Sequence, residues 1–230
     1  MAKKEAVKNI FNDIAPQYDA LNHLLSWGID KGWRKRALKS IEHPEEKRVL
    51  DVACGTGDFS VAAVKAGMKN VIGIDISEKM VEIGRQKVRR LGLKKQIDLQ
   101  EGDSEQMVFE DASFDAVTVA FGVRNFENLE KGLKEIRRVL KPGGKAVILE
   151  FSMPVRFPVK QLYTFYFCRI LPFVGGLMSG NKGAYAYLPA SVRSFPQGEE
   201  FLSILKTCGF TTVSSRRFTF GIASLYCGIK

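Results

Sequence analysis

The spacing of apolar residues divides the chain into segments of different character. In the first segment, 1–45, apolar side chains recur every three or four positions. This spacing predicts helices over 8–14, 17–27 and 30–41. Pro44 then interrupts the pattern, because proline cannot continue a helix. We therefore expect the chain to begin with a group of helices.

A second pattern occupies residues 46–151, where short apolar runs alternate with amphipathic stretches. Ser77 is placed to cap one of the intervening helices, and Lys141–Gly144 would stop the last of them near Leu140. Strands that alternate with helices predict right-handed βαβ units and a parallel sheet. The expected strands are 48–53, 70–75, 97–101, 114–120 and 145–151.

Residues 152–196 break this alternation, because they are rich in aromatic residues and interrupted by proline and glycine. We interpret them as an inserted, mostly helical cap. The pattern returns in 197–230, with a helix over 198–207 and strands over 211–219 and 223–229. These last two strands are expected to close the sheet as an antiparallel hairpin at one edge.

Together the segments predict one domain over residues 1–230 with an α/β fold. Its sheet is expected to be doubly wound and mostly parallel. The composition, with 45% hydrophobic and 26% charged residues, is that of a globular protein and excludes a disordered chain. No apolar run of about 18 residues is present, so no segment is expected to span a membrane.

The chain has a net charge of +10, which favours anionic partners such as nucleic acid or an acidic lipid surface. The four cysteines form no CxxC pair and there are only two histidines, so neither a metal site nor a disulfide framework is expected. The N-terminus lacks the apolar core of a signal peptide, and we therefore expect a cytoplasmic protein.

A glycine-containing turn follows the first predicted strand and opens a helix. Gly55 and Gly57 allow close approach of the backbone to a ligand, which the free N–H groups of the helix N-terminus can bind. Asp75 ends the next strand, 20 residues after Gly55, where a carboxylate can accept both ribose hydroxyls. The alternative is a tight turn beside an exposed carboxylate. The combination of strand, turn, helix and acid favours a nucleoside site.

The charges around this turn indicate which nucleoside is bound. A dinucleotide site normally has a third glycine near the pyrophosphate, whereas this chain has Ser60 at that position. Asp51, Asp75 and Asp103 would repel phosphates but suit a cation that carries an amine. S-adenosylmethionine fits, with Asp51 facing its ammonium directly or through water, Asp75 its ribose, and Asp103 with Ser104 its adenine.

Four segments in order closely resemble the UbiE/MenG family, the C-methyltransferases of menaquinone and ubiquinone synthesis. Residues 138–152 match the family's C-terminal signature in full, and 18–33 resemble its N-terminal signature. The segments read YDALNHLLSWGIDKGW (18–33), FGVRN (121–125), RVLKPGGKAVILEFS (138–152) and YAYLPAS followed by FP (185–196). The resemblance covers about residue 8 to the C-terminus. It implies a Rossmann-like class I S-adenosylmethionine-dependent methyltransferase.

Three positions depart from the family pattern. Leu21 replaces the usual Met, Asp30 replaces the usual His, and Ala120 replaces a Ser at the end of the fourth strand. By resemblance the cofactor contacts include Thr56, Asp75, Asp103 and Ser104. The full set of cofactor-binding residues that we predict is Asp51, Gly55, Thr56, Gly57, Asp75, Ile76, Asp103, Ser104 and Ala120.

The resemblance implies methyl transfer to a ring carbon of a reduced polyprenyl quinone precursor. Such a reaction needs an acceptor for the phenol proton and stabilisation of the oxyanion. Arg124 is the candidate that orients this oxygen, unless it bridges to a carboxylate on a neighbouring loop. His23 and Tyr185 are weaker catalytic candidates, for which packing is the alternative.

Basic and apolar residues gather in two regions of the chain. Lysines and arginines crowd 79–95 and 34–39, and large apolar side chains fill 157–177. A solvated basic face and an apolar core or homodimer contact are the simple interpretations. The alternative is a peripheral contact with an anionic membrane, on its inner face, where a polyprenyl hydroquinone resides.

Menaquinone synthesis is the expected pathway, with the equivalent ubiquinone step as the alternative. A nucleic-acid methyltransferase agrees with the charge, but 120–125 lack the Asn/Asp-Pro-Pro-aromatic element of base amino-group methylation. No recognised nucleic-acid-binding module precedes the core, so no nucleic-acid partner is expected. A non-catalytic cofactor-binding partner of a quinone-synthesis complex stays open on the sequence alone.

Overall fold

The computed structural model describes residues 3–19, 26, 28–171 and 182–230. The side chains of residues 17 and 182–186 also lie outside the description.

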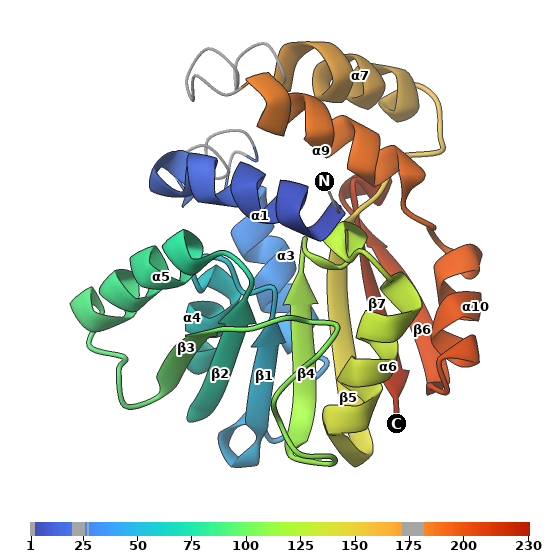
Figure 1. Ribbon diagram of the computed structural model, residues 1–230. Coiled ribbons are helices and arrows are strands. Elements are labelled where there is room, and N and C mark those ends of the chain that lie inside the picture. The colour runs from blue at the N-terminus through green and yellow to red at the C-terminus, as the bar shows by residue number, and fades with distance from the viewer. Residues whose placement is uncertain (1–2, 20–25, 27, 172–181) are drawn as a thin grey trace.

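Seven strands form one sheet in the order β3-β2-β1-β4-β5-β7-β6 (Figure 1). Strands β1 to β5 pair in parallel, whereas β7 runs antiparallel to both β5 and β6. The mostly parallel sheet with an antiparallel edge hairpin is therefore confirmed. The strands are β1 (Arg48–Val52), β2 (Asn70–Asp75), β3 (Ile97–Glu101), β4 (Phe114–Ala120), β5 (Leu140–Phe151), β6 (Thr211–Phe218) and β7 (Ala223–Ile229).

Helices cover both faces of the sheet and its upper edge in Figure 1. The α-helices are α1 (Lys3–Ile14), α3 (Ile29–Leu38), α4 (Asp58–Lys65), α5 (Glu78–Arg90), α6 (Leu129–Val139), α7 (Val159–Phe165), α9 (Lys182–Ser194) and α10 (Glu199–Thr207). The short helical turns are η1 (Ala15–Gln17), η2 (Pro44–Glu46), η3 (Val123–Asn125), η4 (Tyr166–Ile170, a π-helix) and η5 (Thr219–Gly221).

Two hydrophobic cores lie on opposite faces of the sheet. Neighbouring residues of β1 belong to different cores, Val49 with helices α3, α4 and α5, and Leu50 with α6 and α10. Both residues are fully buried. This double burial explains why the parallel strands read as continuous apolar runs rather than as alternating ones.

Helix boundaries follow local chemistry in the places where the sequence gives a clear signal. Ser77 caps α5 as predicted, because its Oγ accepts a hydrogen bond from the backbone N–H of Met80 at 3.2 Å. Asn128 caps α6 in the same way through Lys131, at 2.9 Å. Each cap fixes the start of a helix that packs against the sheet.

The structure differs from the predicted boundaries in two places. Strand β5 begins at Leu140, because residues 141–144 remain in the strand as an irregularity in its pairing with β4 instead of forming a separate turn. Helix α1 begins at Lys3 rather than at residue 8, since its first turn contacts the rest of the chain: the Lys3 Nζ donates to the Phe126 carbonyl at 2.5 Å. The predicted helix over 17–27 lies largely outside the described residues.

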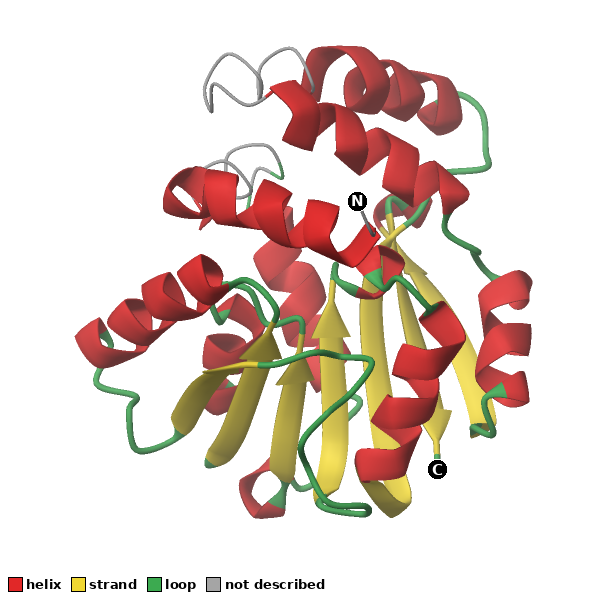
Figure 2. Ribbon diagram, viewed as in Figure 1, coloured by secondary structure: helices red, strands yellow, loops and turns green. Residues whose placement is uncertain are grey.

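A third layer of helices lies over the carboxyl ends of the parallel strands (Figure 2). It consists of α1, α7 with η4, and α9, and its small apolar core contains Ile14, Tyr163, Phe167 and Val192. Within the described residues, no helix combines the length and apolar content needed to cross a bilayer. The described helices of 152–196 belong to this layer.

The packing of α6 against the loop that precedes it requires that residue 132 has no side chain. A Cβ at this position would lie 2.4 Å from the ring of Phe126, which is itself buried. We expect Gly132→Ala to destabilise the protein by about 1–3 kcal/mol, although alanine is the better helix former.

The matched control is Gly32→Ala, because a Cβ there meets no atom within 4 Å and the residue lies in the interior of α3. This variant should gain about 0.5–1 kcal/mol. The measurement is urea unfolding of both variants. Equal stability of the two would contradict the packing argument.

Candidate active site

Two cavities lie side by side at the carboxyl edge of the sheet. The first, which we call the acidic cavity, has a volume of about 80 Å³ and follows the ends of β1, β2 and β4. The second, the aromatic cavity, has a volume of about 340 Å³ and lies between α1, α3, η4 and α9. Phe11, Tyr18 and Phe121 line both and so form the wall between them.

The acidic cavity contains most of the cofactor residues predicted from sequence. The turn after β1, the end of β2 and the segment after β3 converge here because parallel strands all end at the same edge. The predicted residues that line it are Gly55, Asp75, Ile76, Asp103, Ser104 and Ala120.

Asp75 connects the glycine turn to the start of α5. Its two carboxylate oxygens accept backbone hydrogen bonds from Gly55 at 2.8 Å and from Ser77 at 2.9 Å. Burial raises the pKa of Asp75, whereas these two hydrogen bonds oppose that rise. The carboxylate is therefore held in a fixed orientation at the cavity wall.

Asp103 lies at the opposite wall and is paired with helix α1. The Lys4 Nζ donates to it at 2.7 Å, and the backbone N–H of Glu105 donates at 2.9 Å. Partial burial would raise the pKa of Asp103, but the hydrogen bonds and the charge of Lys4 outweigh it, so the pKa is lowered. Helix α1 thus covers the cavity and occupies part of its acidic wall.

Three predicted cofactor residues do not line the acidic cavity. Asp51 is 1% exposed, and its carboxylate accepts hydrogen bonds from Ser60 at 2.6 Å and Thr118 at 2.9 Å, which turn it into the interior. Burial raises the pKa of Asp51 to about 6. A direct contact of Asp51 with a ligand ammonium therefore does not fit this structure.

Thr56 and Gly57 are held away from the cavity by the start of α4. The Thr56 hydroxyl donates to Asp19 at 2.5 Å and accepts from Lys87 at 2.9 Å, which leaves the residue buried. Gly57 has a φ of +81°, and a Cβ there would lie 3.0 Å from Leu99. Its role in this structure is to permit the turn.

The wall of the acidic cavity carries more negative than positive charge. Among the described residues at its wall, four are acidic and Lys4 is the one basic residue. The acidic residues are Asp75, Asp103, Glu105 and Glu127. Such a wall attracts a cation and repels phosphate groups, so the residues fit S-adenosylmethionine better than a dinucleotide.

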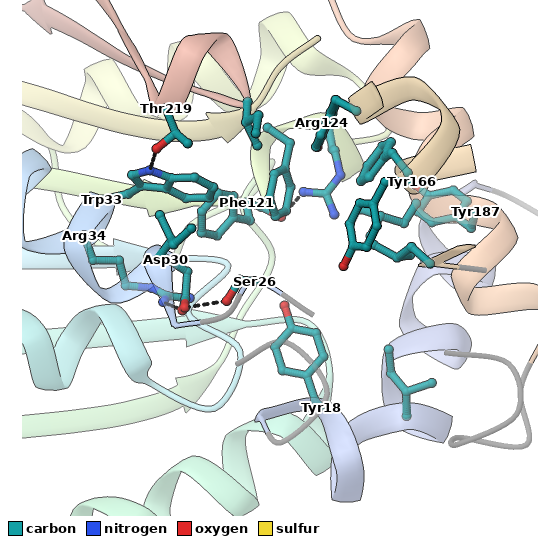
Figure 3. Close-up of a pocket in the computed structure, with 18 of the residues that line it drawn as sticks. Tyr18, Ser26, Asp30, Trp33, Arg34, Phe121, Arg124, Tyr166, Tyr187 and Thr219 are labelled. Atoms are coloured by element: carbon teal, nitrogen blue, oxygen red, sulfur yellow. Dashed lines mark hydrogen bonds and ion pairs between the residues drawn. The ribbon is translucent and has the colours of Figure 1, made fainter. Parts of the chain in front are cut away.

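The aromatic cavity is lined mainly by rings and aliphatic side chains (Figure 3). Phe121 and Phe151 stack with their centroids 4.3 Å apart, and Trp33 packs edge-on against Phe151. The Trp33 Nε1 donates to the Thr219 hydroxyl at 2.8 Å, which satisfies its one polar atom. The cavity can therefore accept a flat apolar ring.

One polar group at the wall of this cavity is the ion pair of Arg124 with Glu150. Their side chains are 5% and 0% exposed, and the Arg124 Nη1 lies 2.9 Å from the Glu150 Oε1. Arg124 also donates to the Phe121 carbonyl and, through Nε, to the Ser191 hydroxyl at 3.3 Å. Burial raises the pKa of Glu150, and the charge of Arg124 opposes this. Arg124 thus bridges to a carboxylate, which lies on the adjacent strand β5 rather than on a loop, while it lines the cavity.

A second polar group lies on α3, at a different part of the cavity wall in Figure 3. Asp30 is 3% exposed, accepts a hydrogen bond from the Ser26 hydroxyl at 2.7 Å, and pairs with Arg34 one helical turn later. The Arg34 guanidinium lies 5.4 Å from the centroid of the Phe121 ring. All three polar residues line the aromatic cavity.

The remaining catalytic candidates are less well defined. His23 lies outside the described residues, and so does the side chain of Tyr185. Tyr187, two residues later, lines the cavity and donates to the Asn125 Oδ1 at 3.1 Å. Among described residues, no group of three or more His, Cys, Asp or Glu side chains could hold a metal ion.

Sequence reasoning gave no role to Glu150 or Lys4, and it placed Arg34 in the basic group 34–39, which was expected to form a solvated face. A signal for Glu150 was present, since it is a charged residue inside the otherwise apolar run 146–151. Lys4 and Arg34 gave no such signal. Each lies among other basic residues, and only the packing of α1 and α3 brings them to the cavities.

Comparison of the sequence with known proteins identifies the family of this chain. The model of the ubiE/COQ5 methyltransferase family matches residues 1–230. A demethylmenaquinone methyltransferase of Bacteroides fragilis is 47% identical, over 99% of this chain and 94% of that protein. A ubiquinone/menaquinone biosynthesis C-methyltransferase UbiE of Geobacter sulfurreducens is 48% identical, over 99% of this chain and 90% of that protein.

Solved structures support the fold. A possible histamine N-methyltransferase of Thermotoga maritima, described as S-adenosylmethionine-dependent, superposes with a TM-score of 0.68 at 20% identity, over 96% of this chain and 99% of that one. Phosphoethanolamine N-methyltransferase 2 of Haemonchus contortus, solved with S-adenosylmethionine, gives 0.63 at 16% identity, over 86% and 52%. The predicted fold class is confirmed. On the match over its whole length, the chain belongs to the ubiE/COQ5 methyltransferase family, as its four motifs predict.

Proposed function

We propose that this protein transfers the methyl group of S-adenosylmethionine to a ring carbon of a reduced, demethylated polyprenyl quinone. The observation that carries the proposal is the contact between the two cavities. An acidic cavity suited to a cation shares the wall of Phe11, Tyr18 and Phe121 with an aromatic cavity suited to a flat ring. The reacting atoms of cofactor and substrate would meet at this wall.

The acidic cavity supplies the groups that would hold the cofactor. Asp75 would accept the ribose hydroxyls, since its carboxylate is fixed by Gly55 and Ser77. Asp103 and Ser104 would face the adenine edge. When bound, the cofactor supplies an electrophilic methyl group on a sulfonium.

Helix α1 must shift for the cofactor to enter. The acidic cavity of about 80 Å³ is well below the roughly 300 Å³ at which ligand pockets begin. Lys4 pairs with Asp103, and Lys8 pairs with Glu101 at 3.0 Å. These two pairs are partly exposed and therefore individually weak, so they add little to the cost of moving α1.

The aromatic cavity would align the acceptor ring. The phenol oxygen would push electron density into the ring, whose unsubstituted carbon bonds to the methyl group as the bond from that methyl group to sulfur breaks. The same carbon then gives up its proton to solvent, and the ring becomes aromatic again. Arg124 points a guanidinium into the cavity from a buried pair with Glu150, where it can stabilise negative charge on the phenol oxygen. The apolar walls exclude water and hold the ring in line.

Menaquinone synthesis is the proposed pathway, because demethylmenaquinone methyltransferases are among the most similar relatives, as in Bacteroides fragilis and, at 45% identity, Porphyromonas gingivalis. The equivalent ubiquinone step is the second candidate, because the name of the Geobacter sulfurreducens relative includes ubiquinone as well as menaquinone biosynthesis.

We also propose that the cap touches the membrane that holds the substrate. Phe157, Leu162 and Phe165 are 81%, 68% and 63% exposed, on and just before α7. Exposed Arg156 and Lys160 accompany them. Apolar side chains beside cations suit the interface of an anionic bilayer, and α7 continues into η4, which lines the aromatic cavity.

The proposed activity is tested with purified protein, S-adenosylmethionine labelled in its methyl group, and either reduced demethylmenaquinone or bulk RNA. We expect label in the quinone and none in RNA. Asp75→Asn should weaken cofactor binding about 10- to 100-fold, because it removes charge-assisted hydrogen bonds.

Calorimetry measures that binding, with Asp98→Asn as the control because Asp98 is exposed on the neighbouring strand β3. Label in RNA alone, or tight NAD binding without cofactor binding, would refute the proposal.

Arg124→Lys separates a catalytic role from a structural one. Lysine keeps the charge beside Glu150 but lacks the guanidinium fork that serves several acceptors at once. We expect kcat to fall about 10- to 100-fold while the Kd of the cofactor changes little, and the Tm to fall modestly because the bonds to Phe121 and Ser191 are lost.

Arg137→Lys is the control, because Arg137 donates to Gly209 on the exposed surface. An unchanged kcat in Arg124→Lys would mean that the ion pair only supports the fold.

Membrane contact is tested by flotation with vesicles that contain or lack anionic lipid. The double variant Phe157→Ser/Phe165→Ser should lose most of the binding, because it removes two exposed aromatic side chains. Val108→Ser is the control, since Val108 is 90% exposed but lies outside the cap. Absence of wild-type flotation with either vesicle would rule out the contact.

A further inference from the structure

The aromatic cavity contains a carboxylate that the proposed reaction does not yet use. Asp30 lies in the first turn of α3, is 3% exposed, and lines the cavity together with Trp33 and Phe121. Burying a charge among rings is unfavourable unless the charge is paired, and Asp30 is paired with Arg34. Figure 3 shows Asp30 beside Ser26 and Arg34 at the cavity wall.

Both carboxylate oxygens of Asp30 have partners close by in the sequence. The Arg34 guanidinium pairs with one carboxylate oxygen and the Ser26 hydroxyl donates to the other. An adjacent cation favours a charged carboxylate over its protonated form. An ionised carboxylate accepts hydrogen bonds and donates none.

An unpartnered donor on Arg34 indicates that a ligand forms hydrogen bonds at this part of the cavity. The Arg34 Nε is buried and has no hydrogen-bond partner among the described residues. The residue is 9% exposed and its guanidinium packs on the face of Phe121. A buried donor without a partner is costly, which is expected where a ligand completes the hydrogen bonding.

Two charged side chains of the cavity wall, Asp30 and Arg124, offer different groups to a ligand. Asp30 presents an acceptor, whereas Arg124 presents donors from a separate part of the wall (Figure 3). A 1,4-hydroquinone carries two hydroxyl groups on opposite sides of its ring. One hydroxyl can donate to Asp30 while the oxygen of the other accepts from Arg124, with the ring between the aromatic walls.

We propose that Asp30 accepts a hydrogen bond from one hydroxyl of the substrate and thereby makes the cavity selective for the hydroquinone over the quinone. This inference rests on the proposed function and names the residue that sets its specificity for the reduced form. A quinone carbonyl has no proton to donate, so it would place its lone pairs against a negatively charged carboxylate and gain no hydrogen bond from it. Sites that are built to bond a hydroxyl reject analogues that lack it.

The experiment measures the Kd values of 2-prenyl-1,4-naphthoquinol and of the corresponding quinone under anaerobic conditions. The wild-type protein should bind the quinol at least tenfold more tightly. In Asp30→Asn the ratio of the two Kd values should fall about tenfold or more, because an amide can also donate to a carbonyl. The ratio is informative because a merely structural defect would weaken both forms alike.

Two further variants control for folding. Asp30→Asn leaves Arg34 without its partner, so Asp30→Asn/Arg34→Gln removes both charges together and should lose the same selectivity. Glu130→Gln/Lys134→Gln changes an ion pair with the same i,i+4 spacing on exposed α6 and should leave the ratio unchanged. Thermal unfolding identifies any variant that fails to fold.

The possible outcomes separate the two proposals. A wild-type preference for the quinol that persists in both Asp30 variants would overturn the role of Asp30 and leave the proposed function intact. Equal binding of both forms by the wild-type protein would also overturn it. If the wild-type protein binds neither form and transfers no methyl group to the quinol, the proposed function fails and this inference fails with it.

Discussion

The aromatic cavity depends on the buried ion pair between Arg124 and Glu150. Glu150 has no exposed surface, and a carboxylate in that position requires a cation within contact distance. The same guanidinium also reaches the Phe121 carbonyl and the Ser191 hydroxyl, so it joins the loop after β4, strand β5 and helix α9 of the cap. Removing one partner of such a pair costs about 3–5 kcal/mol, which constrains both residues for structural reasons before any chemistry is considered.

The sheet topology explains why this pair lies beside the acidic cavity. Strands β1 and β4 are neighbours although β2 and β3 intervene in the sequence, so the chain leaves the carboxyl ends of the two strands in different directions. The turn after β1 contributes to the acidic cavity, and the segment after β4 contributes Phe121 to both cavities. The fold thus places the two cavities against one shared ring, that of Phe121.

Sequence reasoning located strands β1, β2 and β4 well, because their apolar runs are largely buried on both faces of the sheet. It also placed Asp75 and Asp103 at the cavity, since the carboxyl ends of parallel strands share an edge. It did not predict the interior position of Asp51, which depends on hydroxyl groups from α4 and β4 that are far apart in the sequence.

The covering of the acidic cavity by α1 could not be predicted from local pattern. Lys4 looks like any solvated lysine until the packing of α1 over the edge of the sheet brings it to Asp103. The alternatives that the sequence left open for Arg124 are not exclusive in the structure, because one guanidinium both pairs with a carboxylate and faces the cavity. Long-range contacts of this kind have no signature within a window of neighbouring residues.

The difference in charge between the two cavities matches the electrostatics of methyl transfer from a sulfonium to a neutral ring. The acidic wall stabilises the positive charge before the reaction, whereas the aromatic wall has no excess of either sign, because Arg124 is balanced by Glu150 and Arg34 by Asp30. As the methyl group leaves, the positive charge disperses, and a low-dielectric cavity does not penalise that change. A water-filled acceptor cavity would instead let solvent compete for the phenol oxygen. The paired charges therefore provide polar contacts for the substrate without giving the cavity a net charge that would hold water.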